Sequence, residues 1–455
     1  MSGAVISTAR FDLKPLSVAN VTERYAGWLL DPASQQYIVA ASRSSLEQLR
    51  DYVAERSGRD DVLFLGIFIR ETGEHIGNLK YEPIDYSKQI AVCGILVGEV
   101  QWRGKGVAGE VISAGNQWLA KDRKISRILL GVSPDNLAAR RAYEKIGFLP
   151  YDNDANGNLK MVLDLDPARR LAIGTVQFGM DYGVKRARKS DIEEVRDILR
   201  EAFSLGIDTL DTAAAYGESE AVLGAIAADD WKVVSKIGAV PDDCLNIEEW
   251  MDHQVKASLD RLRIPSLYGL LLHVPGQLLG PRGPQIYRAL TRVKELGLAK
   301  KIGISIYSPS ELDEIFRCYA LDLVQAPFNI IDRRLIESGW MKKLVESDVE
   351  LHVRSVFLQG LLLMSSADRP AKFGRWASLW SAWDEWLYQT KLTPLAACLR
   401  YVLSFPEISR VVVGMESLRQ FQEIYASARG QAFTVPSELQ AKDLDLLNPY
   451  KWSAL

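Results

Sequence analysis

Four ionisable side chains follow three successive strand candidates in the second half of the chain, and together they can protonate a reduced carbonyl. They are Asp211, Tyr216, Lys236 and His273. Hydride addition to a carbonyl leaves an alkoxide that needs a proton, and tyrosine is a poor acid near neutral pH unless a cation lowers its pKa. We predict that Lys236 lowers the pKa of Tyr216 and that Asp211 keeps Lys236 charged and oriented. His273 is predicted to align the carbonyl oxygen by a hydrogen bond. A lone Lys or His at a strand end is as often structural, but all four in this order predict a redox site.

A glycine-containing run, Gln101-Trp102-Arg103-Gly104-Lys105-Gly106, lies between a strand candidate and a helix candidate in the first third of the chain. Two glycines allow a tight turn whose N–H groups point inward, and the helix that follows adds its positive end. This combination suits a pyrophosphate. Taken alone, such a short run fits a plain turn better than a phosphate site.

The strands and helices that must position these groups follow two different patterns along the chain, and the patterns meet near residue 167. The first segment combines strand candidates with two later helices, which is typical of an α+β domain. Its strands are expected at 62–70, 74–81, 90–97, 127–132 and 159–165, with a turn at Glu71–Glu74 and helices at 107–122 and 137–146. We place the domain boundaries at 1–167 and 168–455.

The second segment alternates short apolar strands with helices and predicts a (β/α)8 barrel. A doubly wound open sheet is the alternative, but it rarely needs eight regular units. The strands are expected at 171–176, 207–212, 232–236, 268–273, 301–305, 323–325, 350–355 and 410–413. An aromatic-rich stretch, 374–391, interrupts the alternation. The helical spacing of its tryptophans (376, 380, 383 and 386) favours a core-facing stripe over a substrate lid or an interface.

The barrel segment resembles the aldo-keto reductases over residues 169–430, on the runs 174–179, 211–217 and 302–305 and on the four residues above. The resemblance implies a nicotinamide dinucleotide extended over the barrel mouth without a Rossmann domain. It implies cofactor contacts from Gly174 and Thr175, from Ser305 and Gln325 at the carboxamide, from Ser355 and Phe357 near the pyrophosphate, and from Gly414, Ser417, Arg419 and Gln420 on the adenosine side.

Three positions depart from the family pattern. Ile306 stands where an asparagine usually follows Ser305, Arg354 replaces the aromatic residue that stacks on the nicotinamide, and Ile424 replaces an asparagine. The guanidinium of Arg354 could stack in place of the aromatic ring. Arg419 is the one obvious partner for a 2′-phosphate in the last loop. On this basis NADP(H) is favoured over NAD(H).

The first segment resembles the GCN5-related N-acetyltransferases over residues 8–165, on the run 101–106 and on a second block, 133–148. The resemblance implies acetyl-CoA as cofactor, with Asn136 on the pantetheine arm between two parted strands and Tyr143 as general acid on the departing thiolate. The other implied contacts are Val97, Gln101, Arg103, Gly104, Lys105, Gly106, Val107 and Ala108. Tyr143 also fits a buried aromatic residue with a satisfied hydroxyl. Glu82 and Glu99 are candidates for the general base, water-mediated deprotonation being the alternative.

The bulk composition places few further constraints. The chain has 455 residues, a formal charge of -3 and four scattered cysteines. These features give no reason to expect nucleic acid or membrane partners, and they suggest reduced thiols in a soluble, cytoplasmic protein. Four histidines without a ligand motif make a metal site unexpected. The sequence is compatible with a homo-oligomer.

The two domains together predict a bifunctional enzyme that acetylates an amine and reduces or oxidises a carbonyl or alcohol in one pathway. The acetyltransferase segment resembles enzymes that acetylate amino sugars for bacterial surface glycans, and reductases commonly accompany them. We therefore expect the substrate to be an amino sugar or nucleotide-linked amino sugar of such glycans. One alternative makes either domain a cofactor-sensing or regulatory module. Another runs the barrel chemistry oxidatively, as a sugar dehydrogenase or epimerase.

Overall fold

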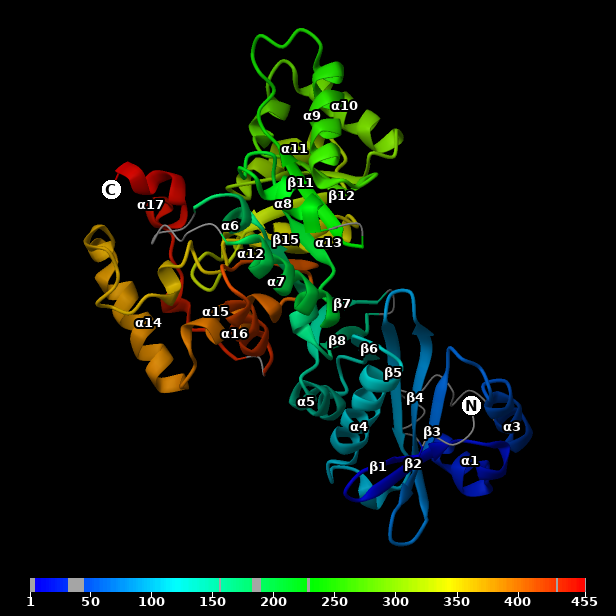
Figure 1. Ribbon diagram of the computed structural model, residues 1–455. Helices are drawn as coiled ribbons and strands as arrows, with labels where there is room; N and C mark the ends of the chain where they lie inside the picture. The colour runs from blue at the N-terminus through cyan, green and yellow to red at the C-terminus, as the bar shows by residue number, and fades with distance from the viewer. Residues whose placement is uncertain are drawn as a thin grey trace. The chain divides into compact units, whose positions relative to one another are not determined.

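The computed structural model describes residues 5–31, 45–154, 157–181, 190–226, 230–430 and 433–454. It divides into two compact units, Met1–Asp166 and Pro167–Leu455 (Figure 1). Over the described residues, no helix is both long and apolar enough to cross a membrane.

The first unit is built on one mixed sheet. The strand order is β1-β2-β3-β4-β5-β6-β8-β7, and every recorded pairing is antiparallel except the parallel pair β5–β6. The strands are β1 (Ile6–Ser7), β2 (Phe11–Pro15), β3 (Leu63–Ile69), β4 (His75–Asp85), β5 (Ile90–Val97), β6 (Arg127–Val132), β7 (Leu149–Asn153) and β8 (Leu159–Asp164). The expected turn between β3 and β4 is present, with Gly73 at a φ of 69°.

Four α-helices accompany this sheet in the described part of the unit: α1 (Glu23–Leu30), α3 (Leu46–Ala54), α4 (Val107–Asp122) and α5 (Leu137–Ile146). Helix α4 buries Val111, Ile112 and Leu119 against apolar residues of the sheet such as Leu79. Short 3₁₀ turns are formed by η1 (Val18–Asn20) and η3 (Val100–Trp102). The unit is therefore an α+β layer in which α4 starts directly behind the predicted phosphate loop.

The second unit is a closed barrel of eight parallel strands, which confirms the predicted (β/α)8 architecture. Neighbouring strands follow the order β10-β11-β12-β13-β14-β15-β16-β9. Their bounds are β9 (Leu171–Gly174), β10 (Thr209–Asp211), β11 (Lys232–Ile237), β12 (Leu267–Leu272), β13 (Ala299–Ser305), β14 (Leu323–Pro327), β15 (Glu350–Arg354) and β16 (Arg410–Gly414).

Helices surround the barrel because each crossover between parallel strands must return along the outside. The α-helices are α6 (Val176–Gly179), α7 (Ile192–Ser204), α8 (Ser219–Ile226), α9 (Ile247–Leu262), α10 (Gly283–Glu295), α11 (Ser310–Cys318), α12 (Arg334–Glu337), α13 (Trp340–Glu346), α14 (Ala377–Thr390), α15 (Pro394–Leu403), α16 (Leu418–Ala428) and α17 (Leu444–Leu447). The 3₁₀ turns are η4 (Pro167–Arg170), η5 (Pro275–Leu279), η6 (Leu361–Leu363), η7 (Ala371–Trp376), η8 (Ser437–Leu439) and η9 (Pro449–Ala454).

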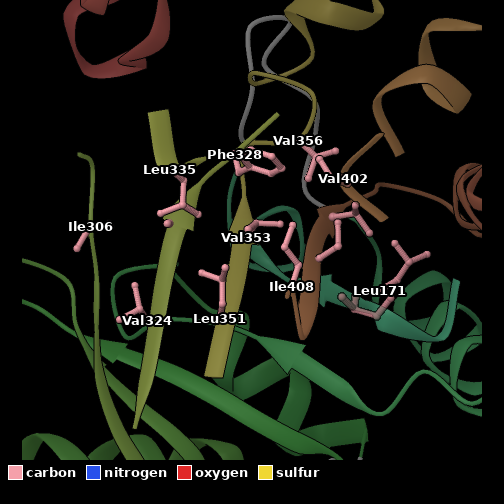
Figure 2. Packing of buried hydrophobic residues seen from close by; sticks show 14 of the residues in the cluster. Leu171, Ile306, Val324, Phe328, Leu335, Leu351, Val353, Val356, Val402 and Ile408 are labelled. Atoms are coloured by element: carbon pink, nitrogen blue, oxygen red, sulfur yellow. The ribbon is translucent and has the colours of Figure 1, made fainter. Parts of the chain in front are cut away.

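The barrel strands are apolar on both faces, as expected for a sheet covered on each side. Figure 2 shows part of the resulting core around β14 and β15, with Val324, Leu351 and Val353 on the strands and Leu335 and Val402 from the covering helices. The tryptophan stretch forms α14, in which Trp380, Trp383 and Trp386 are buried. The prediction of a core-facing stripe is therefore confirmed.

Candidate active sites

The carboxyl ends of three neighbouring barrel strands bring the four predicted redox residues together. Asp211 is the last residue of β10, Lys236 lies at the end of β11, and His273 directly follows β12. Tyr216 lies in the loop after β10, where its N–H donates to the Ala213 carbonyl. Parallel pairing of the strands fixes these positions side by side at one rim of the barrel.

Lys236 and Asp211 form a buried ion pair at the base of this group. Lys236 Nζ donates to Asp211 Oδ1 at 2.7 Å and to the Thr212 carbonyl at 2.9 Å. The two side chains are 1% and 5% exposed. Burial lowers the pKa of Lys236, and the charge of Asp211 opposes that shift. The third N–H of the ammonium donates to no residue that the structure describes, so it is available to Tyr216.

Tyr216 lies between this ammonium and His273. Lys236 Nζ lies 5.2 Å from the centroid of the Tyr216 ring, and the Tyr216 and His273 rings are 6.1 Å apart, edge to face. Burial, with the positive charges of Lys236 and Arg354 acting in the same direction, lowers the pKa of His273 to about 4. His273 is therefore neutral at physiological pH and can still donate one hydrogen bond to a carbonyl oxygen.

The electrostatics of Tyr216 differ from the prediction. We expected the neighbouring ammonium to lower the pKa of this phenol, but burial raises it, and the charge of Asp211 raises it further. The reason is that desolvation of the phenolate and the charge of Asp211 outweigh the positive charge of Arg354, which acts in the opposite direction. At neutral pH the phenol is protonated, which is the form that a proton donor needs.

Ser305 and Gln325 are buried next to Asp211, and neither lines the cavity described below. Gln325 Nε2 donates to Asp211 Oδ2 at 2.6 Å, whereas Ser305 Oγ makes a long contact of 3.4 Å to Gln325 Oε1. The Gln325 amide therefore orients the Asp211 carboxylate, and the contacts of both residues with a nicotinamide carboxamide stay a prediction.

A cavity of about 730 Å³ opens beside Asp211, Tyr216 and His273. Its volume lies within the ~300–1,000 Å³ of ordinary ligand pockets. Six of the predicted cofactor residues line it: Gly174, Thr175, Ser355, Phe357, Gly414 and Gln420. Gln177 also lines it, and its Oε1 is buried without a hydrogen-bond partner in the described structure. The cavity therefore offers both the length and an unused polar group that a dinucleotide requires.

The loop after β15 borders this cavity with an unusual backbone. Ser355, Leu358 and Gln359 have φ values of 60°, 48° and 52°, and Gly360 follows at 89°. Non-glycine residues rarely adopt the left-handed region, and such strain concentrates at ligand-binding sites. This observation fits the expected pyrophosphate contact near Ser355 and Phe357.

Three carboxylates line the cavity. Glu416 and Glu423 lie beside and on α16 with Gln420 and Ile424, and Asp368 is the third. Arg419 does not line the cavity: its side chain is 87% exposed and pairs with Glu423. Ser417 does not line the cavity either, because it caps α16 by accepting from Gln420 N. The end predicted to receive the adenosine thus presents carboxylates rather than a free cation.

In the first unit, the predicted phosphate loop leads directly into α4. Gly104 and Gly106 each have a φ of 74°, and Gly106 is the N-cap of the helix. The N–H groups of Gly104, Gly106, Val107 and Ala108 donate to no group that the structure describes. Free N–H groups at a helix start form an anion site. The geometry of this loop therefore suits a pyrophosphate.

The polar side chains of this loop are engaged elsewhere. The Arg103 guanidinium donates to the carbonyls of Val97 and Gly98 and to Asp31 at 2.7 Å. Gln101 donates to Glu99, and Lys105 lies over the Trp102 ring. The predicted rim charge of Arg103 is therefore neutralised. Arg10 was missed by the sequence analysis, although its Nη2 lies 3.8 Å from where a Cβ on Gly106 would stand.

The two central strands part beside this loop. Pairing of β5 with β6 is recorded only at Ile90–Val92, although β5 continues to Val97. This opening matches the parted strands expected for the pantetheine arm. Asn136 N-caps α5 and accepts from Ala139 N, which leaves its amide N–H₂ without a described partner.

Tyr143 of α5 packs edge to face on Phe148. Burial raises the pKa of its phenol, which is therefore a neutral donor at physiological pH, and no described residue hydrogen-bonds its hydroxyl. The role of Tyr143 as general acid stays a prediction.

The candidate bases are held in ion pairs. Hydrogen bonds from Arg24 lower the pKa of Glu99 to about 2. Burial pushes the pKa of Glu82 upward, but hydrogen bonds from Lys80 and Arg56 outweigh it and lower the pKa overall. Both carboxylates are weak bases here, which favours deprotonation of the amine through water. Among the described residues, no group of His, Cys, Asp and Glu could hold a metal ion.

The two units match two known families. Residues 170–435, more than half of the chain, match the aldo/keto reductase family, and residues 10–149 match the acetyltransferase (GNAT) domain. Members of the first family use NAD(P)H, and the second domain implies acetyl-CoA.

Individual relatives are distant. An N-acetyltransferase 9-like protein of Caenorhabditis briggsae is 26% identical over 28% of this chain and 68% of its own length. An aldo-keto reductase of Mycolicibacterium vanbaalenii is 34% identical over 28% of this chain and 45% of its own length. The matched region thus spans about half of this reductase. A solved aldo-keto reductase of Bacillus halodurans superposes with a TM-score of 0.47 at 22% identity, covering 58% of this chain and 88% of its own.

Proposed function

Because the chain belongs to the aldo/keto reductase family and carries an acetyltransferase domain of the GNAT type, we propose that it is a bifunctional enzyme with two separate active sites. The barrel reduces a carbonyl with NAD(P)H, and the first unit transfers an acetyl group from acetyl-CoA to an amine. The observation that carries the proposal is the buried Lys236–Asp211 pair beside Tyr216 and His273, on the wall of a long cavity.

In the proposed reduction, a bound reduced nicotinamide supplies the hydride. His273, neutral because burial and nearby cations lower its pKa to about 4, donates a hydrogen bond that positions the carbonyl oxygen. Tyr216 gives its proton to the oxygen as negative charge develops there. Lys236 stabilises the phenolate that is left, and Asp211 holds Lys236 in place.

The protonation state of the phenol suits reduction. Burial raises the pKa of Tyr216, so the protonated form dominates at neutral pH. That form can donate the proton that carbonyl reduction needs. We therefore propose that the barrel is adapted to carbonyl reduction at neutral pH.

We further propose NAD(H) as the preferred dinucleotide, in place of the NADP(H) expected from Arg419. Arg419 is paired with Glu423, and the cavity lining around α16 includes carboxylates that would repel a 2′-phosphate and accept hydrogen bonds from a 2′-hydroxyl. Comparing the dissociation constants of NADH and NADPH by protein fluorescence tests this. Tighter binding of NADPH would refute it.

For the first unit, acetyl-CoA supplies the acetyl group. The free N–H groups at the start of α4 would hold its pyrophosphate, the parted strands β5 and β6 its pantetheine arm, and Tyr143 would protonate the departing thiolate. The pairing of an acetyltransferase with a reductase supports an amino sugar or nucleotide-linked amino sugar as the common substrate. We expect a cytoplasmic protein that acts on small molecules.

The test is a pair of variants assayed for both activities. Candidate amino sugars are incubated with acetyl-CoA and NADH, separately and together, and the products are measured by mass spectrometry. Tyr216→Phe should stop reduction and spare acetylation, whereas Gly106→Val should do the reverse. If either variant, still folded, lost both activities, the two sites would not be independent. If the wild type bound both cofactors but turned over no aldehyde and no amine in a broad panel, the sensing alternative would replace the proposal.

A further inference from the structure

An arginine without an acidic partner lies in the wall of the barrel cavity, next to the redox residues. Arg354 is the last residue of β15, and it is the one Lys or Arg among the described residues that line the cavity. Its charge acts on three redox residues, because it contributes to the pKa shifts of Tyr216, Lys236 and His273. The guanidinium is therefore close to where a carbonyl would react.

The guanidinium is held in place but not neutralised. Its Nη1 donates to Ser355 Oγ at 3.2 Å and its Nη2 to the Ile306 carbonyl at 2.9 Å. One face lies over the Tyr307 ring, 4.9 Å from its centroid. No described carboxylate lies within ion-pair distance of it. An arginine has five N–H donors, so several remain for a ligand.

The charge of Arg354 is also not offset by Asp211, the acidic residue of the redox group. Both carboxylate oxygens of Asp211 already accept hydrogen bonds, one from Lys236 and the other from Gln325. The acidic residues Glu416 and Glu423 lie beside and on α16, and neither forms an ion pair with Arg354. A half-buried guanidinium with unused donors and no counter-charge is costly unless a ligand brings the anion.

Resting on the proposed reductase function, we propose that Arg354 binds an anionic group, a carboxylate or a phosphate, carried by the carbonyl substrate. The planar fork of a guanidinium binds either group through two parallel hydrogen bonds. Tyr307 fixes the plane of the fork, and the two hydrogen bonds to Ser355 and Ile306 fix its rotation. Arg354 thus acts as a specificity-determining residue that selects charged over neutral carbonyl compounds.

The experiment compares carbonyl substrates that differ in charge but little in shape. 4-Oxobutanoate is paired with butanal, and glyceraldehyde 3-phosphate with glyceraldehyde. The wild type should show a kcat/KM at least ten times higher for the anionic member of one pair, and the pair that responds tells a carboxylate from a phosphate. In Arg354→Gln this selectivity ratio should fall about 10- to 100-fold, because hydrogen bonds to a charged group are lost. Arg354→Lys should restore part of it.

A matched control is Arg333→Gln. Arg333 also donates to backbone carbonyls and lies over a tyrosine ring, that of Tyr401, but it does not line the cavity. Its selectivity ratio should equal that of the wild type. Equal kcat/KM for both members of each pair in the wild type would overturn the inference and leave the reductase proposal intact. A loss of NADH affinity in Arg354→Gln with an unchanged ratio would also overturn it, because the guanidinium would then serve the cofactor. No reduction of any aldehyde by the wild type would instead refute the reductase function.

Discussion

Replacing Gln325 by methionine separates two roles for this residue. The family resemblance places Gln325 on the nicotinamide carboxamide, whereas the structure places its amide on Asp211 Oδ2 at 2.6 Å, away from the cavity wall. Gln325→Met keeps the length of the side chain and removes the donor. On the structural placement, Asp211 loses a hydrogen bond in this variant, and the cofactor loses nothing.

The size of the effect follows from the burial. Gln325 is 0% exposed, so the variant leaves Asp211 Oδ2 facing an apolar methionine in a buried position. A hydrogen bond to a charged group contributes about 1.5–3 kcal/mol, and we expect the free energy of unfolding to fall by about 2 kcal/mol. If a similar amount is lost from the positioning of Lys236, kcat falls about 10- to 30-fold, since each factor of ten corresponds to ~1.36 kcal/mol.

The assays are urea unfolding, kcat for a carbonyl substrate, and NADH binding by fluorescence. We expect lower stability and lower kcat with a dissociation constant for NADH within about twofold of the wild type. Ser305→Ala is the control, because it removes only the long 3.4 Å contact to the same amide, and its effects should be smaller. A variant that binds NADH ten times more weakly while keeping kcat and stability would show that Gln325 contacts the cofactor after all.

Three further results are expected. Tyr216→Phe should lower kcat for reduction by about 10²- to 10⁴-fold, the usual contribution of a positioned acid, and acetyl transfer should be unchanged. Gly106→Val should raise the dissociation constant of acetyl-CoA at least tenfold, because its φ of 74° strains a branched residue, whereas Gly109→Ala in the same helix should not. The pKa of His273 is lowered to about 4, so the unfolded chain, with its histidine pKa near 6.5, binds the extra proton between these values. Stability should therefore be full above pH 6.5 and fall as the pH drops toward 4, and His273→Gln should flatten that decline in acid unfolding curves.

Most of the barrel could be predicted from the sequence because the barrel strands are short apolar runs between helices. This pattern follows from the packing of the strands in the core. All eight predicted strands are present, and Asp211, Lys236 and His273 stand at their carboxyl ends. In the first unit, the helices 107–122 and 137–146 were predicted to the residue. The strands β1, β2 and β7 were missed. They are short or carry polar residues, so no apolar run marks them.

The site was harder to predict wherever a role depends on side-chain direction or on distant neighbours. A strand end places Gln325 near the rim, but only the alternation of side chains across β14 decides that it points to Asp211. The pKa of Tyr216 required the balance between burial and the Asp211–Lys236 pair, which spacing does not contain. Tyr450 lines the same cavity and accepts a hydrogen bond from Tyr307, yet 143 residues separate the two in the sequence.

The charges in the barrel cavity link the proposed preferences for cofactor and substrate. Arg354 contributes a positive charge without an ion-pair partner among the described residues, while Glu416 and Glu423 contribute negative charge beside and on α16. A dinucleotide without a 2′-phosphate and a carbonyl substrate with an anion would suit both sets of charges. NADPH with a neutral aldehyde would place a phosphate near carboxylates and leave the guanidinium unpaired. Because both proposed preferences are electrostatic, we expect both to weaken as the ionic strength rises.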